Sequence, residues 1–417
     1  MNDTVAKDVN DTVTKDVWVL ADDLSGAAEC AAAFLGTGRP VTVHLTADRL
    51  TDGAPTADGE VTVIDLNTRT MNEPACAART LRKALDAVPT EAVLVKKIDS
   101  LLRGHIRAEV GALADRGPVL VAAGLPVLGR LVVDGVLHVD GTPLHHTDHW
   151  SAETRVPPES IAALLRDLPT EDRISIHDVL TDADLDAIVQ SAADTRTQLV
   201  GTAALAAAVA RVAVPHSDSS VSGPIDRGPV TPRMTDRVLV VAGTAAPAAR
   251  EQITRLVDAG ACHIRLPAAD LLAGTIEASA LHASLREHRV TVVSVSGELD
   301  AARARVLSSR LGAVIADAQA ATTPDLVLTG GETARGVLDA LGISLLRPYH
   351  EIHHGAVLSC TPEGRRLVTR PGSFGDADSF TTIVDHLLAP ATDHAANTKA
   401  AHTEALHPTA LHAKESS

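Results

Sequence analysis

Two kinds of segment alternate along most of this sequence: short runs of apolar, often β-branched residues, and longer alanine-rich stretches with helical spacing. A turn containing Gly, Asp or Ser separates most short runs from the stretch that follows. Such a chain favours parallel β-sheets, because neighbouring parallel strands must be joined by a crossover, usually a helix that packs on the sheet. The pattern therefore predicts an α/β fold with largely parallel sheets.

The short apolar runs predict where the strands lie. They are residues 17–20, 41–45, 61–66, 92–96 and 119–122 in the first half, and residues 237–242, 290–295, 325–328 and 366–369 in the second. Two Asp-Gly pairs, Asp134-Gly135 and Asp140-Gly141, flank a further short run. Because Asp-Gly favours the tight turns of β-hairpins, we expect an antiparallel hairpin within residues 131–144.

The length of the chain and one irregular segment predict two domains. A chain of 417 residues is long enough for two domains of ordinary size. Residues 214–236 contain four prolines and no periodic pattern, as linkers do. We therefore expect α/β domains at residues 17–213 and 237–389, a disordered N-terminal extension at residues 1–16 and a disordered tail at residues 390–417.

The charge balance narrows the classes of ligand. The net charge is −16, from 37 Lys and Arg against 53 Asp and Glu, and the chain has only two Trp, one Tyr and three Phe. This composition disfavours binding to nucleic acids or anionic membranes, which require basic surfaces or aromatic platforms. The N-terminus is polar and acidic, and no apolar run approaches the roughly 18 residues of a membrane span. We expect a cytoplasmic protein that binds a small molecule.

Candidate catalytic carboxylates follow the first predicted strand, where Asp22 and Asp23 precede a predicted helix. In open α/β sheets, ligands bind beyond the carboxyl ends of the strands. Two carboxylates at such a place can hold Mg²⁺ or accept a proton from a substrate hydroxyl. The alternative is that one of them only caps the helix. A cap needs one carboxylate and two are present, so we favour a chemical role.

A cluster of charged side chains follows the fourth predicted strand, in the segment KKIDSLLRGH at residues 96–105. With two nearby turns it supplies Lys96, Lys97, Asp99, Arg103, Arg69 and Arg130. A solvated run of charges is the alternative, but such a run seldom lies between a buried strand and a glycine. We predict that this cluster binds an anion, helped by the N-terminus of the helix that follows.

Three glycine-containing turns follow predicted strands of the second half, at residues 243–244, 329–333 and 371–375. Glycine lets the backbone approach a ligand closely, and the helices that begin after these turns favour negative charge at their N-termini. The turns match neither GxxxxGK[ST] nor GxGxxG, so the P-loop and the dinucleotide fingerprint are excluded. Together they predict a phosphate-binding site of another design.

Five segments in their order along the chain resemble the four-carbon acid sugar kinase family: ADDLSGA, KKIDSLLRG, the stretch from GR to DG at residues 129–135, GGETA and RPGSFGD. The resemblance covers about residues 17–389. It implies two α/β domains, the first binding a sugar acid and the second a nucleotide, with the active site in the cleft between them. The implied reaction is ATP-dependent phosphorylation of the terminal hydroxyl of threonate, erythronate or a 3-oxo-tetronate, and a homodimer is one possible assembly.

The resemblance also implies roles for individual residues. Asp22 and Asp23 would be catalytic, one of them as the base on the substrate hydroxyl. The sugar acid or the transferred phosphoryl group would be held by Arg69, Lys97, Asp99, Arg103 and Arg130. ATP would be bound by Thr244, Gly330, Gly331, Glu332, Thr333, Gly372 and Gly375, with Mg²⁺ bridging its phosphate oxygens.

Two other classes of function stay open at this stage. The segment DSLLRGH departs from the DSTLRGN usual in the family, and the turn that usually reads GSCS is Gly243-Thr244-Ala245-Ala246 here. The lost hydroxyls would suit a non-catalytic sensor that binds nucleotide or sugar acid. A sugar-phosphate aldolase or isomerase with a Schiff base on Lys97 is the other alternative, although it leaves the three glycine turns unexplained.

Overall fold

The computed structural model describes residues 15–46, 59–151, 153, 155–193, 195–213, 231–243, 247–297, 303–372 and 374–390. We refer to the described residues up to 213 as the N-terminal half and to those from 231 as the C-terminal half. Nearly all of the predicted N-terminal extension and tail, and most of the predicted linker, lie outside the described residues, as does Thr244.

A seven-stranded parallel sheet forms the N-terminal half, in the order β2-β3-β1-β4-β10-β5-β9. The strands are β1 (Val17–Ala21), β2 (Val41–His44), β3 (Val61–Asp65), β4 (Val93–Lys97), β5 (Val119–Ala122), β9 (Ile174–Ile176) and β10 (Gln198–Gly201). The helices are α1 (Leu24–Ala32), α2 (Pro74–Leu85), α3 (Ile106–Ala114), α4 (Ile161–Leu165), α5 (Asp182–Ala192) and α6 (Ala203–Val212). The expected hairpin is present as β6 (Arg130–Val133) and β7 (Val136–Val139). A third short strand, β8 (Thr142–Pro143), pairs with β7.

The C-terminal half contains five parallel strands and two antiparallel ones, in the order β12-β13-β11-β14-β17-β16-β15. They are β11 (Val238–Ala242), β12 (Cys262–Pro267), β13 (Val290–Ser296), β14 (Asp325–Thr329), β15 (Leu345–His353), β16 (Ala356–Cys360) and β17 (Arg366–Arg370). The helices are α7 (Pro247–Asp258), α8 (Ala268–Ala273), α9 (Ser279–Glu287), α10 (Ala304–Gln319), α11 (Gly331–Ala340) and α12 (Ser379–Leu388). The predicted α/β fold with largely parallel sheets is confirmed.

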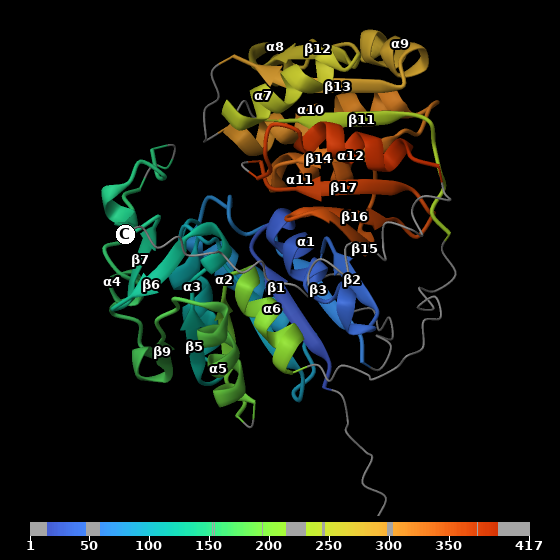
Figure 1. Ribbon diagram of the computed structural model, residues 1–417. Helices are drawn as coiled ribbons and strands as arrows, with labels where there is room; N and C mark the ends of the chain where they lie inside the picture. Colours follow the sequence, from blue (N-terminus) through green and yellow to red (C-terminus); the bar gives the residue numbers. More distant parts are fainter. Residues whose placement is uncertain are drawn as a thin grey trace, which may run out of the picture.

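The two sheets are joined edge to edge into one sheet of 14 strands, a feature that the sequence pattern did not predict. The junction is an antiparallel pair between β2 and β15, with Leu345 opposite His44 and Leu346 opposite Val43. Figure 1 shows the C-terminal half above the N-terminal half, with β15 next to β2 and β16 on the other side of β15. The pairing covers the exposed edge of each sheet, where unpaired backbone groups would otherwise face solvent.

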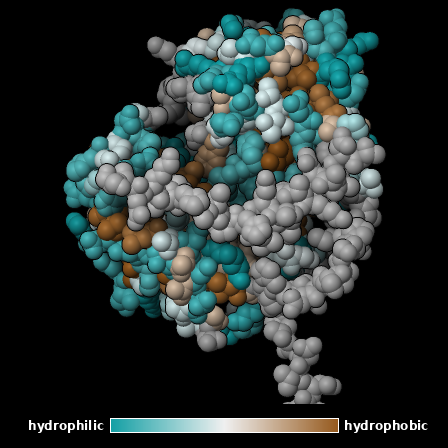
Figure 2. Space-filling view, viewed as in Figure 1, coloured by the Kyte–Doolittle hydropathy of each residue, from teal (hydrophilic) through white to brown (hydrophobic). Residues whose placement is uncertain are grey.

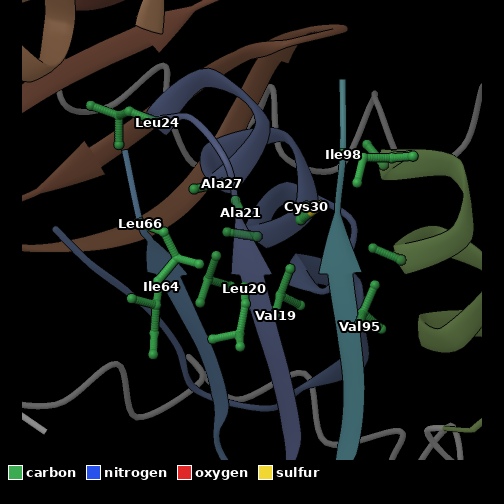
Figure 3. Packing of buried hydrophobic residues seen from close by; sticks show 14 of the residues in the cluster. Val19, Leu20, Ala21, Leu24, Ala27, Cys30, Ile64, Leu66, Val95 and Ile98 are labelled. Atoms are coloured by element: carbon green, nitrogen blue, oxygen red, sulfur yellow. The ribbon is translucent and has the colours of Figure 1, made fainter. Parts of the chain in front are cut away.

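Helix α1 lies at this junction and contacts both halves. It packs on β1 and β3 of its own half and also against α11, β15, β16 and β17 of the other. Small side chains let it lie close to the sheet: Ala27 and Cys30 are fully buried, near Val19 and Val95 (Figure 3). Because α1 is fixed by the core of one half and touched by the other, its first turn is held at the boundary between them.

A buried ion pair also connects the halves. Arg335 on α11 donates from Nη1 to Oδ2 of Asp65 at the end of β3, over 2.9 Å. Burial raises the pKa of Asp65 to about 6, and Arg335 opposes that rise. Nearby, Arg305 donates to the carbonyl of Asn67 over 3.2 Å. These contacts cross the boundary at the carboxyl ends of the strands, where the turns that follow β1 and β3 also lie.

The surface is mostly hydrophilic on the side shown in Figure 2, where apolar residues form small separate patches. Within the described residues, no helix is long and apolar enough to cross a membrane.

Arg335→Ala should lower the free energy of unfolding by about 3 kcal/mol at pH 8, because it leaves the Asp65 carboxylate buried without its cation. The loss should be smaller at pH 5. The pKa of Asp65 in the folded protein, about 6, is above the ordinary value of 3.8. Folding therefore favours the protonated form of Asp65, and the stability that this protonation contributes is lost as the pH rises through 6. Urea unfolding at the two pH values measures both effects.

The double variant Arg335→Ala/Asp65→Asn should recover part of the lost stability, since it removes the buried charge. Arg211→Ala is the control, because its ion pair with Asp186 is exposed and should contribute less than about 1 kcal/mol. Equal losses for Arg335→Ala and Arg211→Ala would contradict the structural importance of the buried pair.

Candidate active site

Asp22 and Asp23 follow β1 and differ in their surroundings. The Asp23 carboxylate caps α1, since its Oδ1 accepts from the backbone N–H of Gly26 over 3.0 Å. The capping alternative is thus correct for Asp23, but it occupies only one oxygen. Among the described residues, no hydrogen bond to Oδ2 of Asp23 is found. Asp22 is almost fully buried, whereas Asp23 is partly exposed and can meet a ligand.

Arg69 connects the acidic side chains of the site. Its Nε and Nη2 donate to the two oxygens of Asp22, each over 2.8 Å, and Nη2 also donates to Oδ1 of Asp23 over 2.7 Å. Its Nη1 lies 3.5 Å from Oδ1 of Asp99. Burial acts to raise the pKa of Asp22, but Arg69 and Lys97 outweigh it and hold the pKa below its usual value. Asp22 is therefore a charged, saturated anchor.

The backbone explains why Arg69 reaches this position. The N–H groups of Thr68 and Arg69 both donate to the carbonyl of Asp22, over 3.0 and 3.1 Å. This folds the turn after β3 over the end of β1, since the two strands are neighbours in the sheet. The sequence offered little support for Arg69, yet it lies at the centre of the cluster.

Asp99 and Arg103 form a second pair in the turn after β4. Arg103 donates from Nε and Nη2 to the two oxygens of Asp99, over 2.7 and 2.9 Å. The same carboxylate accepts from the backbone N–H groups of Leu101 and Arg103, each over 3.2 Å. Burial acts to raise the pKa of Asp99, but Arg69 and Arg103 outweigh it and lower the pKa far below its usual value. Asp99 has a structural role in shaping the turn.

The two lysines at the end of β4 point to opposite faces of the sheet, as successive strand residues must. Lys97 faces the site: its Nζ is 4.0 Å from Oδ1 of Asp22 and lies against Gly26, where a Cβ would collide with it. Lys96 is completely buried on the other face, with its Nζ 3.1 Å from Oε2 of Glu109. The expectation that Lys96 belongs to the anion-binding cluster is therefore wrong.

Arg130 completes the group of cations. Its Nη1 donates to the hydroxyl of Ser100, and its Nε is buried without a hydrogen-bond partner among the described residues. Arg69 and Arg103 are hydrogen-bonded to carboxylates, whereas Lys97 and Arg130 have no carboxylate within hydrogen-bonding distance among the described residues. The positive cluster expected from the sequence thus consists of two cations bound by carboxylates and two that are not.

The glycine turns of the C-terminal half lie at the carboxyl ends of adjacent strands. Ala242 of β11 pairs with Thr329 of β14, and Thr329 pairs with Arg370 of β17. After these strands come Gly330 and the first residues of α11, Gly331, Glu332 and Thr333, and the turn with Gly372 and Gly375; the described Gly243 lies against the side chain of Thr333. The structure therefore brings these predicted nucleotide residues to one edge of the sheet.

Gly331 meets the turn of Asp22 and Asp23 in the other half. A Cβ at Gly331 would be 2.5 Å from Oδ2 of Asp23 and 3.1 Å from Oγ of Ser25. Gly330 precedes α11 with a φ of 86°, a conformation that strains other residues. The N-terminus of α11, which favours negative charge, is thus in direct contact with the uncommitted oxygen of Asp23.

Arg370, the first residue of the RPGSFGD segment, and Gln252 of α7 hold the last glycine turn. Arg370 donates to Oε1 of Gln252 over 2.7 Å and to the carbonyl of Phe374. Gln252, fully buried on α7, donates to the carbonyls of Gly375 and Asp376 over 3.2 and 2.7 Å. Nothing in the sequence distinguishes Gln252 from an ordinary helix residue, because its partners lie 118 or more positions away.

A cavity of about 680 Å³ lies elsewhere in the C-terminal half, lined in part by Asp325 and Arg365. These residues stand at the amino ends of β14 and β17, opposite the glycine turns. None of the predicted site residues lines this cavity. Because ligands of open α/β sheets bind at the carboxyl ends of the strands, we place the active site at the boundary near Asp23 and Gly331.

Comparisons with known families agree with this division of the chain. A model described as a sugar-binding N-terminal domain matches residues 17–156, and one described as a nucleotide-binding C-terminal domain matches residues 239–380. A D-threonate kinase of Cupriavidus necator is 30% identical over 402 residues, covering 86% of this chain and 94% of its own. The chain belongs to the four-carbon acid sugar kinase family. The predicted family is thus confirmed, and membership makes this protein a kinase.

Further relatives of this kinase have related names. A D-threonate kinase of Salmonella typhimurium is 27% identical, covering 88% of this chain and 97% of its own, and a 3-oxo-tetronate kinase of Methylobacterium radiotolerans is 26% identical, covering 88% and 98%. A solved structure of a Haemophilus influenzae protein has a TM-score of 0.63 at 19% identity, covering 89% of this chain and 100% of its own. At that identity it supports the fold alone.

Gly331→Ala should lower the free energy of unfolding by about 1–3 kcal/mol, because the new methyl group would overpack the contact with Asp23 and Ser25. Thermal or urea unfolding measures the change. Gly36→Ala is the matched control, since nothing lies within 4 Å of a Cβ there and stability should be unchanged or slightly raised. If both variants behaved alike, the close contact between the halves would not exist in solution.

Proposed function

We propose that this kinase transfers the terminal phosphoryl group of ATP to the terminal hydroxyl of a four-carbon sugar acid such as threonate, erythronate or a 3-oxo-tetronate. The names of the relatives support the substrate class. The observation that carries the proposal is the contact between Asp23 of one half and the N-terminus of α11 of the other. An acceptor hydroxyl beside Asp23 and a phosphate beside α11 would be neighbours.

Lys97 and Arg130 would hold the carboxylate of the sugar acid. Both are cations of the site that lack a carboxylate partner within hydrogen-bonding distance among the described residues, unlike Arg69 and Arg103. Burial acts to lower the pKa of Lys97, but Asp22 and Asp23 outweigh it and raise the pKa. Lys97 is thus a protonated cation at neutral pH, which suits anion binding and argues against a Schiff-base mechanism, since that requires the neutral amine.

Asp23 would act as the general base, because its Oδ2 is uncommitted and exposed to the boundary between the halves. Asp22 is a poor candidate for this role: both of its oxygens accept from Arg69, and its pKa is lowered. Its proposed task is to hold Arg69, which in turn fixes Asp23 and Asp99. In phosphoryl transfer a carboxylate that orients the hydroxyl is sufficient, since positioning and charge neutralisation supply most of the catalysis.

The turns at Gly330–Thr333 and Gly372–Gly375, with Thr244 outside the described residues, would bind the phosphates of ATP through backbone N–H groups. Mg²⁺ would neutralise charge on the phosphate oxygens when bound. Among the described residues there is no group of three or more side chains that would hold a metal. This fits Mg²⁺, which keeps several waters and commonly uses one or two carboxylates together with phosphates.

Asp23→Asn should reduce kcat by about 10²–10⁴-fold, the range that a general base contributes, with little change in nucleotide affinity. Asn is as good a helix cap as Asp, so α1 should stay intact. ADP release in a coupled assay, over a panel of tetronates, measures turnover, and the shift in melting temperature on adding ATP measures binding. Asp186→Asn, at an exposed position on α5, is the control and should keep wild-type activity.

Near-normal turnover by Asp23→Asn would show that Asp23 is not the base. A wild-type protein that binds ATP and tetronates without releasing ADP would instead be the sensor that the altered motifs also allow. Binding of a tetronate without any effect of ATP on the melting temperature would overturn the nucleotide site.

A further inference from the structure

The proposed reaction assigns no role to Glu29, a carboxylate at the boundary between the two halves. Glu29 follows Ser25 by four positions on α1, so the two side chains share a face of the helix. The Glu29 side chain is only 10% exposed, and Ser25 is 7% exposed. Neither Oε1 of Glu29 nor Oγ of Ser25 has a hydrogen-bond partner among the described residues. Buried polar atoms are almost always paired, so these two are placed to receive a ligand.

The charged groups around Glu29 come from both halves. Lys97 and Asp23 lie on its own side, and Arg130 also interacts with it electrostatically. From the C-terminal half, Nε2 of His354 is 3.8 Å from Oε1 of Glu29, too long for a hydrogen bond. Burial raises the pKa of Glu29, and Lys97 and His354 only partly oppose it. The carboxyl group therefore stands in the proposed substrate site and is not saturated by protein donors.

His354 fixes the opposite wall of the same space. Its ring stacks on Phe374 of the glycine turn, with ring centroids 5.6 Å apart, and its Nδ1 is 3.9 Å from Oε1 of Glu351. Glu351 in turn accepts from the N–H of Gly355 over 2.8 Å. The hairpin turn between β15 and β16 thus reaches Glu29 from the C-terminal half, and a ligand bound beside this pair would contact both halves.

The unsatisfied groups of the site are of two kinds: the cations Lys97 and Arg130, and the carboxylate of Glu29. The carboxylate of a sugar acid is attracted by Lys97 and Arg130 and repelled by Glu29. Its hydroxyl groups need acceptors, and the oxygens of Asp22 and Asp99 are already occupied by arginines. We propose that Glu29 accepts a hydrogen bond from an inner hydroxyl of the sugar acid, at C2 or C3, and thereby selects hydroxylated four-carbon acids. This inference rests on the proposed function.

A substrate with one hydroxyl removed tests the contact directly. The wild-type protein and Glu29→Ala are compared on a tetronate that the wild type phosphorylates, on 3,4-dihydroxybutanoate, which lacks the C2 hydroxyl, and on 2,4-dihydroxybutanoate, which lacks the C3 hydroxyl. The wild type should prefer the tetronate over one analogue by at least about tenfold in kcat/KM, because the analogue leaves a buried acceptor unpaired. In Glu29→Ala that preference should fall below about threefold.

Two further variants separate a substrate contact from a structural effect. Glu29→Gln keeps a neutral acceptor of the same size and should give an intermediate preference, since bonds to charged acceptors are stronger. Glu351→Gln alters the other carboxylate beside His354 and should keep the wild-type preference. If Glu29→Ala fails to fold, Glu29→Gln alone decides the question.

The outcomes distinguish this inference from the proposed function. An active Glu29 variant with the wild-type preference for both hydroxyls would overturn the inference and leave the proposed function standing. The same holds if the wild type does not distinguish the tetronate from either analogue. A wild type that releases no ADP with any tetronate would overturn the proposed function, and the inference with it.

Discussion

The bonding of Arg69 to three carboxylates is the interaction on which the site depends. Asp22, Asp23 and Asp99 follow two adjacent strands and would repel one another without a cation among them. Isolated buried carboxylates are costly, and a planar guanidinium can satisfy several at once. Since Arg69 occupies both oxygens of Asp22 but only one of Asp23, it leaves Oδ2 of Asp23 free at the boundary, where chemistry would take place.

The second requirement is that the two halves meet at that oxygen. The strand pair of β2 with β15, the ion pair of Asp65 with Arg335, and the packing of α1 against the C-terminal half all hold them together. Together they bring Gly331 and the N-terminus of α11 against Asp23. A phosphate beside α11 and an acceptor hydroxyl beside Asp23 could therefore be adjacent only at this boundary, to which both halves contribute. Exclusion of water from such a boundary would protect the phosphoryl group from hydrolysis.

An acidic protein needs local cations to bind an anion, and the arrangement of those cations decides what kind of anion fits. Arg69 and Arg103 are neutralised by carboxylates and serve the architecture, whereas Lys97 and Arg130 keep capacity for a ligand. In the same half, Glu29 offers an acceptor close enough to interact with both cations. A ligand with a carboxylate at one end and hydroxyls along its length would satisfy this pattern, and a simple dicarboxylate would not, because Glu29 would repel its second charge.

The sequence determined the α/β class, most strand positions and the turns that carry the chemistry, because periodicity and turn residues act locally. It did not predict β15, where polar residues break the pattern, or β9, β10, β12 and β16, and it could not tell that Lys97 faces the site while Lys96 faces the core. The central place of Arg69, the free oxygen of Asp23 and the exposure of Glu29 to the other half were decided only by tertiary structure. Each depends on atoms that are distant in the chain, as with Arg335 and Asp65, 270 positions apart. Folding alone brings such groups into contact, and contact rather than residue type sets which charges are satisfied and which stay free to bind.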